Sequence, residues 1–239
     1  MTRRAASRSR RYRVGLGGLV VFAGIAVVEH ALQPNLSPRT HEISEYVNGD
    51  PGWLMVLGFL SWSASLAATA ALAAGDWRPA GQHALLAWSR VVLLDLSAAG
   101  ILITACFATQ TSAGKLPPGA TLDLGGRLHD VGSGVATLAL VGAAVASIAN
   151  GDGSGVYRRR TAMILLVALA SDVALLVAGP SVGGIRQRVL LACGALWQLL
   201  ALRAWECDAD RSGAGAGGCP GSRGTSVAVR CGVTTRRRR

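Results

Sequence analysis

Residues 128–149 read LHDVGSGVATLALVGAAVASIA, and this stretch decides the class of fold. After its third position it carries no charged residue, and a helix of this length crosses a hydrocarbon core of about 30 Å. Backbone groups in lipid must bond to one another, so an apolar run of this length is expected to be a helix. Small residues such as Gly132 and Gly142 let neighbouring helices approach closely. We therefore predict a transmembrane helix inside a compact bundle.

Five further apolar runs of similar length lie on either side of this one. They cover residues 14–32, 52–74, 84–107, 161–179 and 185–205. The sequence thus predicts an all-α fold, a polytopic bundle of six transmembrane helices over residues 14–205. A basic segment precedes it at residues 1–13. A tail rich in arginine and glycine follows at residues 206–239, and its low apolar content predicts disorder.

The composition agrees with a membrane protein and argues against a nucleic-acid partner. The chain is 51% hydrophobic and only 15% charged, whereas soluble domains carry about 25% charged residues. The net charge is +11, but the arginines cluster at the chain ends and in certain loops. With the amino terminus inside, 18 of the 24 lysines and arginines fall in cytoplasmic segments and 5 in outer ones. This count predicts a multi-pass cell-membrane protein, in contact with membrane lipid, with both termini cytoplasmic.

Two loops on the predicted outer side are unusually polar. One reads PRTHEISEYVNGDPGW at residues 38–53, and the other ends LDLGGRLHD at residues 122–130. Both lead directly into helices at the same membrane face, where Glu29 and His30 also end the first span. These segments are expected to converge on one outer vestibule. The candidate outer polar cluster consists of His41, Ser44, Glu45, Arg127 and His129.

The beginning of the fourth helix favours an anion site. Arg127 lies beside the first free N–H groups of that helix, and both features attract negative charge. His129 is a candidate proton carrier or phosphate ligand, because histidine as a residue type changes its charge near neutral pH. A structural histidine that bridges loops is the alternative. His41 would assist His129, and Glu45 would orient a histidine. The first functional hypothesis is therefore binding or handling of a lipid or other anionic amphiphile at this extracytoplasmic vestibule.

Three ionisable residues, Arg90, Asp95 and Asp172, fall within the apolar runs. Charges at membrane depth are costly and mark functional sites by default. Counted along their spans, the two aspartates lie at similar depth, and the Arg90 side chain is long enough to reach Asp172. The set predicts either a neutral structural pair of Arg90 with Asp172 or a proton or ion relay. The relay supports a second hypothesis, a small coupled transporter.

No motif in the chain identifies a reaction. The 5 cysteines include no C-x-x-C pair, and no G-x-S-x-G is present, so zinc and serine-hydrolase sites are not indicated. We expect no metal and no cofactor. A third hypothesis is a haem-binding electron carrier, because His30 and His129 both lie near the outer face and haem b needs two axial histidines. The sequence leaves the oligomeric state open.

The two outer segments resemble a membrane family called domain of unknown function 998. Its I-S-x-x-x-x-G segment matches Ile43, Ser44 and Gly49, and its G-R-x-H segment matches Gly126, Arg127 and His129. The resemblance implies a six-helix bundle over most of residues 14–205, without a settled activity. One departure is clear. Relatives often show F-P-x-D after the third helix, whereas this chain reads FATQ at residues 107–110. If the missing acid supports activity, that activity is altered or lost here.

Overall fold

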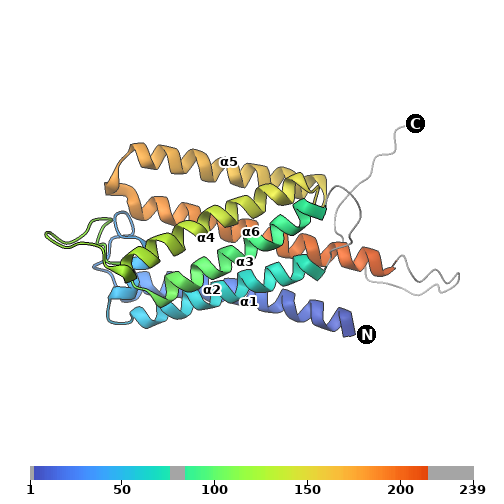
Figure 1. The fold of residues 1–239 in the computed structure, drawn as a ribbon, viewed down its shortest axis with the longest axis horizontal. Coiled ribbons are helices and arrows are strands. Elements are labelled where there is room, and N and C mark those ends of the chain that lie inside the picture. The colour runs from blue at the N-terminus through green and yellow to red at the C-terminus, as the bar shows by residue number, and fades with distance from the viewer. Residues whose placement is uncertain (1–2, 76–83, 215–239) are drawn as a thin grey trace, which may run out of the picture.

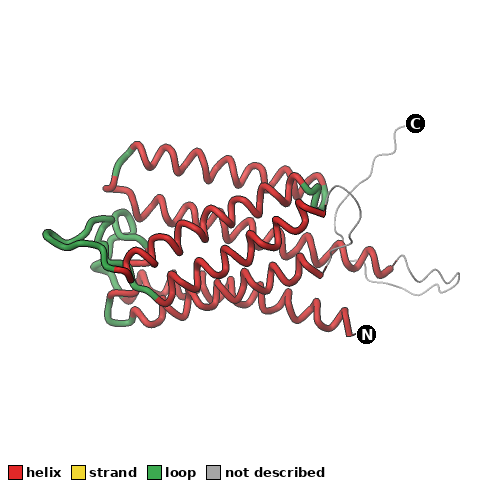
Figure 2. The backbone as a smooth tube through the Cα atoms, viewed as in Figure 1, coloured by secondary structure: helices red, strands yellow, loops and turns green. Residues whose placement is uncertain are grey.

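The computed structural model describes residues 3–75 and 84–214, and their regular elements are helices (Figure 1 and Figure 2). Six of these helices are long and apolar enough to cross a membrane. This arrangement confirms the predicted all-α, six-helix fold. The long helices are α1 (Arg3–Leu32), α2 (Gly52–Gly75), α3 (Ala84–Cys106), α4 (Leu124–Ala149), α5 (Gly155–Val177) and α6 (Gly183–Ala214), and the 3₁₀ turns are η1 (Ile43–Asn48) and η3 (Pro180–Val182).

The two ends of the bundle hold different segments of the chain (Figure 1). The loop end holds three connections, residues 33–51, 107–123 and 178–182. The opposite end, called the terminus end, holds the beginning of α1, the described end of α6 and the short connection 150–154. Since consecutive helices alternate in direction, the two polar segments identified from the sequence meet at the loop end.

Helix boundaries differ from the predicted ones mainly at the terminus end. The basic segment at residues 1–13 is not a separate element, because α1 begins at Arg3. Helix α5 begins at Gly155 rather than 161, because the Ser154 hydroxyl caps it by accepting a hydrogen bond from the Tyr157 N–H at 3.2 Å. Because the first turns of α5 are rich in polar residues, the beginning of the helix cannot be located from hydropathy.

The expected disordered tail is described only at its beginning. Helix α6 continues to Ala214, which is beyond the expected end of the sixth span at residue 205. The rest of the tail, residues 215–239, lies outside the described residues.

Helices α3 and α4 pack backbone against backbone through two glycines. A Cβ atom added at Gly100 would lie 2.5 Å from the Gly132 carbonyl oxygen, and one added at Gly132 would lie 2.9 Å from the Gly100 oxygen. No larger residue fits either position without moving a helix. The expected role of Gly132 in close helix packing is confirmed by this contact.

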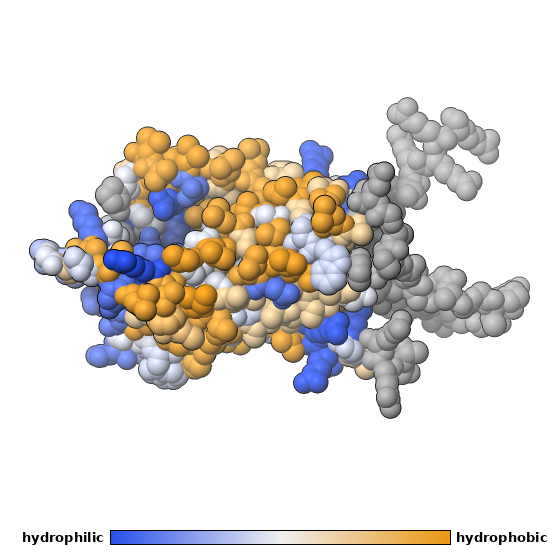
Figure 3. Space-filling view, in the orientation of Figure 1, coloured by the Kyte–Doolittle hydropathy of each residue, from blue (hydrophilic) through white to orange (hydrophobic). Residues whose placement is uncertain are grey.

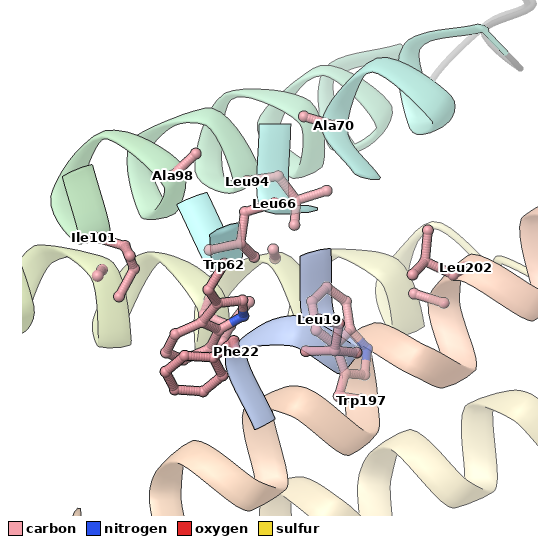
Figure 4. Close-up of a cluster of buried hydrophobic side chains, with 14 of the residues drawn as sticks. Leu19, Phe22, Trp62, Leu66, Ala70, Leu94, Ala98, Ile101, Trp197 and Leu202 are labelled. Carbon is pink, nitrogen blue, oxygen red and sulfur yellow. The ribbon is translucent and has the colours of Figure 1, made fainter. Parts of the chain in front are cut away.

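The apolar core lies between α1, α2, α3, α4 and α6 (Figure 4). Phe22 of α1 stacks on Trp62 of α2, with ring centroids 4.5 Å apart. Leu94 of α3 and Leu202 of α6 are fully buried in the same core. In lipid this packing, rather than expulsion of water, holds the helices together.

A buried glutamine joins α6 to α2 inside this core. The Gln198 side chain is fully buried, and its oxygen accepts a hydrogen bond from the Trp62 indole at 2.9 Å. Its amide nitrogen donates to the hydroxyls of Ser65 at 2.8 Å and Thr69 at 3.0 Å. All the polar atoms of Gln198 are therefore engaged with α2, which fixes the position of the last helix.

Candidate functional site

All five residues of the predicted outer polar cluster lie at the loop end. His41 lies in the connection after α1, and Ser44 and Glu45 lie on η1. Arg127 and His129 lie in the first turns of α4. Ser44, Glu45 and His129 are buried, His41 is half-buried, and Arg127 is exposed. The side chains of His41, Glu45 and His129 each contact different groups.

Glu45 anchors the long connection between α3 and α4. Its carboxylate is 3% exposed and accepts hydrogen bonds from the backbone N–H groups of Ala113 at 2.8 Å and Gly114 at 3.1 Å. The backbone of Ala113 adopts a φ of 51°, a left-handed conformation that this anchor helps to maintain. Asn48 adds a hydrogen bond to the Thr109 carbonyl at 2.9 Å. The described partners of Glu45 are thus backbone groups and not a histidine.

His129 bridges α4 and the end of α3. Its Nδ1 atom lies 2.6 Å from the Phe107 carbonyl oxygen, and because a carbonyl only accepts, Nδ1 carries the proton. Arg127 points outward at the same helix end. There the Asp123 carboxylate caps α4 by accepting from the Gly126 N–H at 2.8 Å. We expected an anion to bind the free N–H groups at the start of α4, but one of them, the N–H of Gly126, already donates to the Asp123 carboxylate.

A half-buried arginine of α6 forms the centre of the loop-end contacts. The Arg188 guanidinium donates to His30 Nε2 at 2.9 Å, to the His41 carbonyl at 2.7 Å and to the Tyr46 hydroxyl at 3.2 Å. Because His30 Nε2 accepts, the ring proton lies on Nδ1, which faces the Ala26 carbonyl. Both ring nitrogens of His30 are therefore engaged, and a haem iron bound there would have to displace Arg188.

Sequence reasoning did not select Arg188, although a signal was present. Two glycines, 183 and 184, open the sixth span just before the run Ile185–Arg186–Gln187–Arg188. A Cβ atom at Gly184 would lie 2.4 Å from the His41 carbonyl oxygen. The glycine therefore lets the connection after α1 lie directly on α6, within reach of Arg188. Glycine beside polar residues at a helix start indicates such a close approach.

A cavity lies between the α5–α6 hairpin and the other helices. It has an empty volume of about 870 Å³, counting the open space at its mouth. Helices α4 and α5 diverge toward the loop end (Figure 1), and Figure 3 shows a recess with hydrophilic groups there. Its wall is mostly apolar and includes Phe59, Trp62, Leu140, Leu165, Leu191 and Trp197.

Polar residues concentrate toward the loop end of this cavity. Ser44 of η1, Thr104 of α3, Ser133 of α4 and Gln187 of α6 line it there, while Ser97 and Thr137 line it nearer the middle of their helices. Ser44, which belongs to the segment that suggested the family, is thus the one residue of the predicted outer cluster that lines the cavity. The site is amphipathic, with an apolar interior and a polar end.

Charged groups of both signs surround the polar end of the cavity. Gln187 donates to the Glu42 carboxylate at 3.3 Å. Burial raises the pKa of Glu42 above its ordinary value, and the nearby Glu45 and Asp130 raise it further, whereas Arg186 lowers it. Arg186 also lies 3.4 Å from Asp172, and both side chains are partly exposed. A ligand at this end would meet one accessible cation and several acids.

The expected pair of Arg90 with Asp172 is wrong. Arg90 is 5% exposed and forms its ion pair with Asp152, in the connection between α4 and α5. Its guanidinium also lies 4.7 Å from the Trp205 ring centroid. Because α5 begins at Gly155, Asp172 lies about 26 Å along that helix, near the loop end, while Arg90 lies near the terminus end.

Asp95 has a third environment. It lies at the middle of α3 and is exposed on the outside of the bundle. The three charges inside the predicted spans are therefore found at three separate places. This separation does not favour a relay that passes through all of them.

Comparison with known proteins gives the family. No curated protein and no solved structure matches the chain. One family model, described as Protein of unknown function (DUF998), matches residues 16–204, which is most of the chain and includes at least part of each of the six long apolar helices. This multi-pass membrane protein therefore belongs to the family called domain of unknown function 998.

Proposed function

We propose that this protein binds a lipid-like amphiphile in the cavity between the α5–α6 hairpin and the other helices. The observation that carries the proposal is the amphipathic lining of that cavity, which is apolar inside and polar at the loop end. An acyl chain fits the apolar part, and a head group fits the polar end. The recess between α4 and α5 offers entry from the side, so that a lipid would not have to leave the membrane.

The charges at the polar end favour a head group that carries both signs. Arg186 is the accessible cation, and arginine binds phosphate well. Glu42 and Asp130 are close enough to interact with a positive group, such as an ammonium. The anionic head group inferred from Arg127 receives less support, because Asp123 already caps the helix beside it. Phosphatidylethanolamine has the required combination of a phosphate and an ammonium group.

We further propose that the terminus end faces the cytoplasm of a cell membrane and that the site opens on the other side. The terminus end carries Arg8, Arg10, Arg11, Arg13 and the run Arg158–Arg160. Arginine-rich segments beside membrane helices remain on the cytoplasmic side. The amphiphile would then have its head group in the outer leaflet.

Native mass spectrometry after purification in mild detergent tests the proposed cavity. We expect a retained lipid on the wild-type protein, loaded from vesicles of phosphatidylethanolamine and phosphatidylglycerol. Thr137→Trp, which fills the cavity mouth, should remove this lipid. Leu138→Trp is the matched control, because Leu138 is the next residue and is 75% exposed on the outside. Equal lipid retention by the two variants would sink the cavity proposal.

A second pair of variants tests the head group. Arg186→Ala should selectively lower retention of phosphatidylethanolamine, whereas Arg127→Ala should leave it unchanged. The reverse result, with phosphatidylglycerol lost on Arg127→Ala, would return the head-group site to the amino terminus of α4, as the sequence first indicated.

A further inference from the structure

Asp95 lies where a carboxyl group is hardest to accommodate. It is 11 residues from each end of α3, which places it about 16 Å from both membrane surfaces. Its side chain is exposed on the outside of the bundle, between the exposed residues Val92 and Leu96. The space-filling view shows a mostly apolar surface along the middle of the bundle (Figure 3).

The described residues of the same chain give Asp95 no hydrogen bond and no ion pair, in contrast to the other two intramembrane charges. Arg90 is paired with Asp152, and Asp172 is paired with Arg186. Asp95 also does not line the cavity described above, since Ser97 and Ile101 present the opposite face of α3 to it. An aspartate side chain is too short to reach the membrane surface from this depth. A group in such a position calls for a partner inside the membrane.

We propose that the Asp95 face of α3 is the interface of a homodimer, in which the two Asp95 carboxyls hydrogen-bond to each other. A carboxyl in hydrocarbon takes up a proton rather than remain charged, and it then both donates and accepts. It is therefore complementary to a second copy of itself. A two-fold axis along the membrane normal places both copies of Asp95 at the same depth, which no unrelated partner does automatically.

The surroundings of Asp95 suit such a contact. Ala99 lies one turn further along the same exposed face and is small enough to let two α3 helices approach. Val92 and Leu96 are 48% and 45% exposed and would pack beside the carboxyl pair. The surface is apolar except at the one position where the two copies would exchange hydrogen bonds.

Co-purification of two differently tagged full-length chains from nanodiscs tests this proposal. We expect the wild-type chains to associate and Asp95→Asn to remain associated, because an amide also donates and accepts. Asp95→Leu should weaken association about tenfold, the effect of one or two hydrogen bonds in a membrane. Val167→Leu on the exposed face of α5 is the control and should change nothing. Asp95→Leu must still elute as a folded monomer in size-exclusion chromatography.

Cysteine cross-linking gives an independent measurement. In a chain whose five native cysteines are replaced by serine, Ala99→Cys should form a disulfide-linked dimer on oxidation, whereas Val167→Cys should not. Wild-type chains that remain monomeric in nanodiscs, or Asp95→Leu chains that associate as tightly as the wild type, would overturn the proposal. So would cross-linking of Ala99→Cys to a different membrane protein alone. Lipid retention is measured separately, so this result does not depend on the proposed function.

Discussion

Each end of the bundle contains an arginine that is at least half-buried, and the two arginines differ in the kind of partner that their guanidinium groups contact. At the terminus end, Arg90 meets the Asp152 carboxylate, so that the pair is neutral. At the loop end, Arg188 donates to neutral acceptors, namely two backbone carbonyls, an imidazole and a phenol. At the terminus end, this neutral ion pair links α3 to the connection between α4 and α5. At the loop end, Arg188 forms no ion pair within the described residues, and the carboxylates of Glu45 and Glu42 interact with its charge only at longer range.

The largest expected effect comes from breaking the neutral pair. Asp152→Ala leaves the Arg90 charge buried without its partner, which should lower the free energy of unfolding by about 3–5 kcal/mol. Asp172→Ala is the matched control, because its pair with Arg186 is partly exposed and should be worth less than about 1 kcal/mol. Denaturant unfolding in detergent measures both. Equal losses of unfolding free energy would show that the buried Arg90–Asp152 pair contributes no more to stability than the partly exposed Arg186–Asp172 pair.

An intermediate effect is expected at the loop end. Arg188→Met removes the hydrogen bonds that hold the connection after α1, and we expect a loss of about 2–3 kcal/mol. Hydrogen exchange should become faster in residues 36–48, while α3 and α4 keep their protection. Arg186→Met, two residues earlier on the same helix, is the control and should leave this exchange unchanged. Faster exchange throughout the bundle would mean that Arg188 supports the whole fold rather than the loop end.

The contrast between the ends also explains what the sequence could predict. Six spans follow from hydropathy, because each helix must satisfy its backbone within lipid. The polar loops were correctly placed at one end, because that needs only the alternation of helix direction. The Arg188 contacts were not predictable, because His30 lies 158 positions away in the chain. The Arg90 partner was missed because the depth of Asp172 was counted from a wrong start of α5, and because Asp152 lies in a short connection between helices.

The smallest effect concerns pH. Burial raises the pKa of Glu42, so the folded state favours its neutral form. The stability that this form contributes is complete below the ordinary pKa of glutamate, about 4.3, and is lost as the pH rises through the folded value. Glu42→Gln stays neutral and should therefore gain thermal stability over the wild type between pH 4 and pH 7. A constant difference in Tm across this range would contradict the proposed environment of Glu42.

The buried Gln198 has a consequence for the order in which the protein is built. Synthesis delivers α6 last, when the indole and the two hydroxyls of α2 that will bond to Gln198 are already in the membrane. Until α6 arrives, these groups have no such partner and the cavity has only part of its wall. Insertion of α6 would then be the step that completes the hydrogen bonds of α2. The Ser65 and Thr69 hydroxyls already donate to the Gly15 and Ser65 carbonyls. A chain that stops before α6 would therefore leave the Trp62 indole N–H without its acceptor in lipid, a defect that quality control in the membrane can recognise.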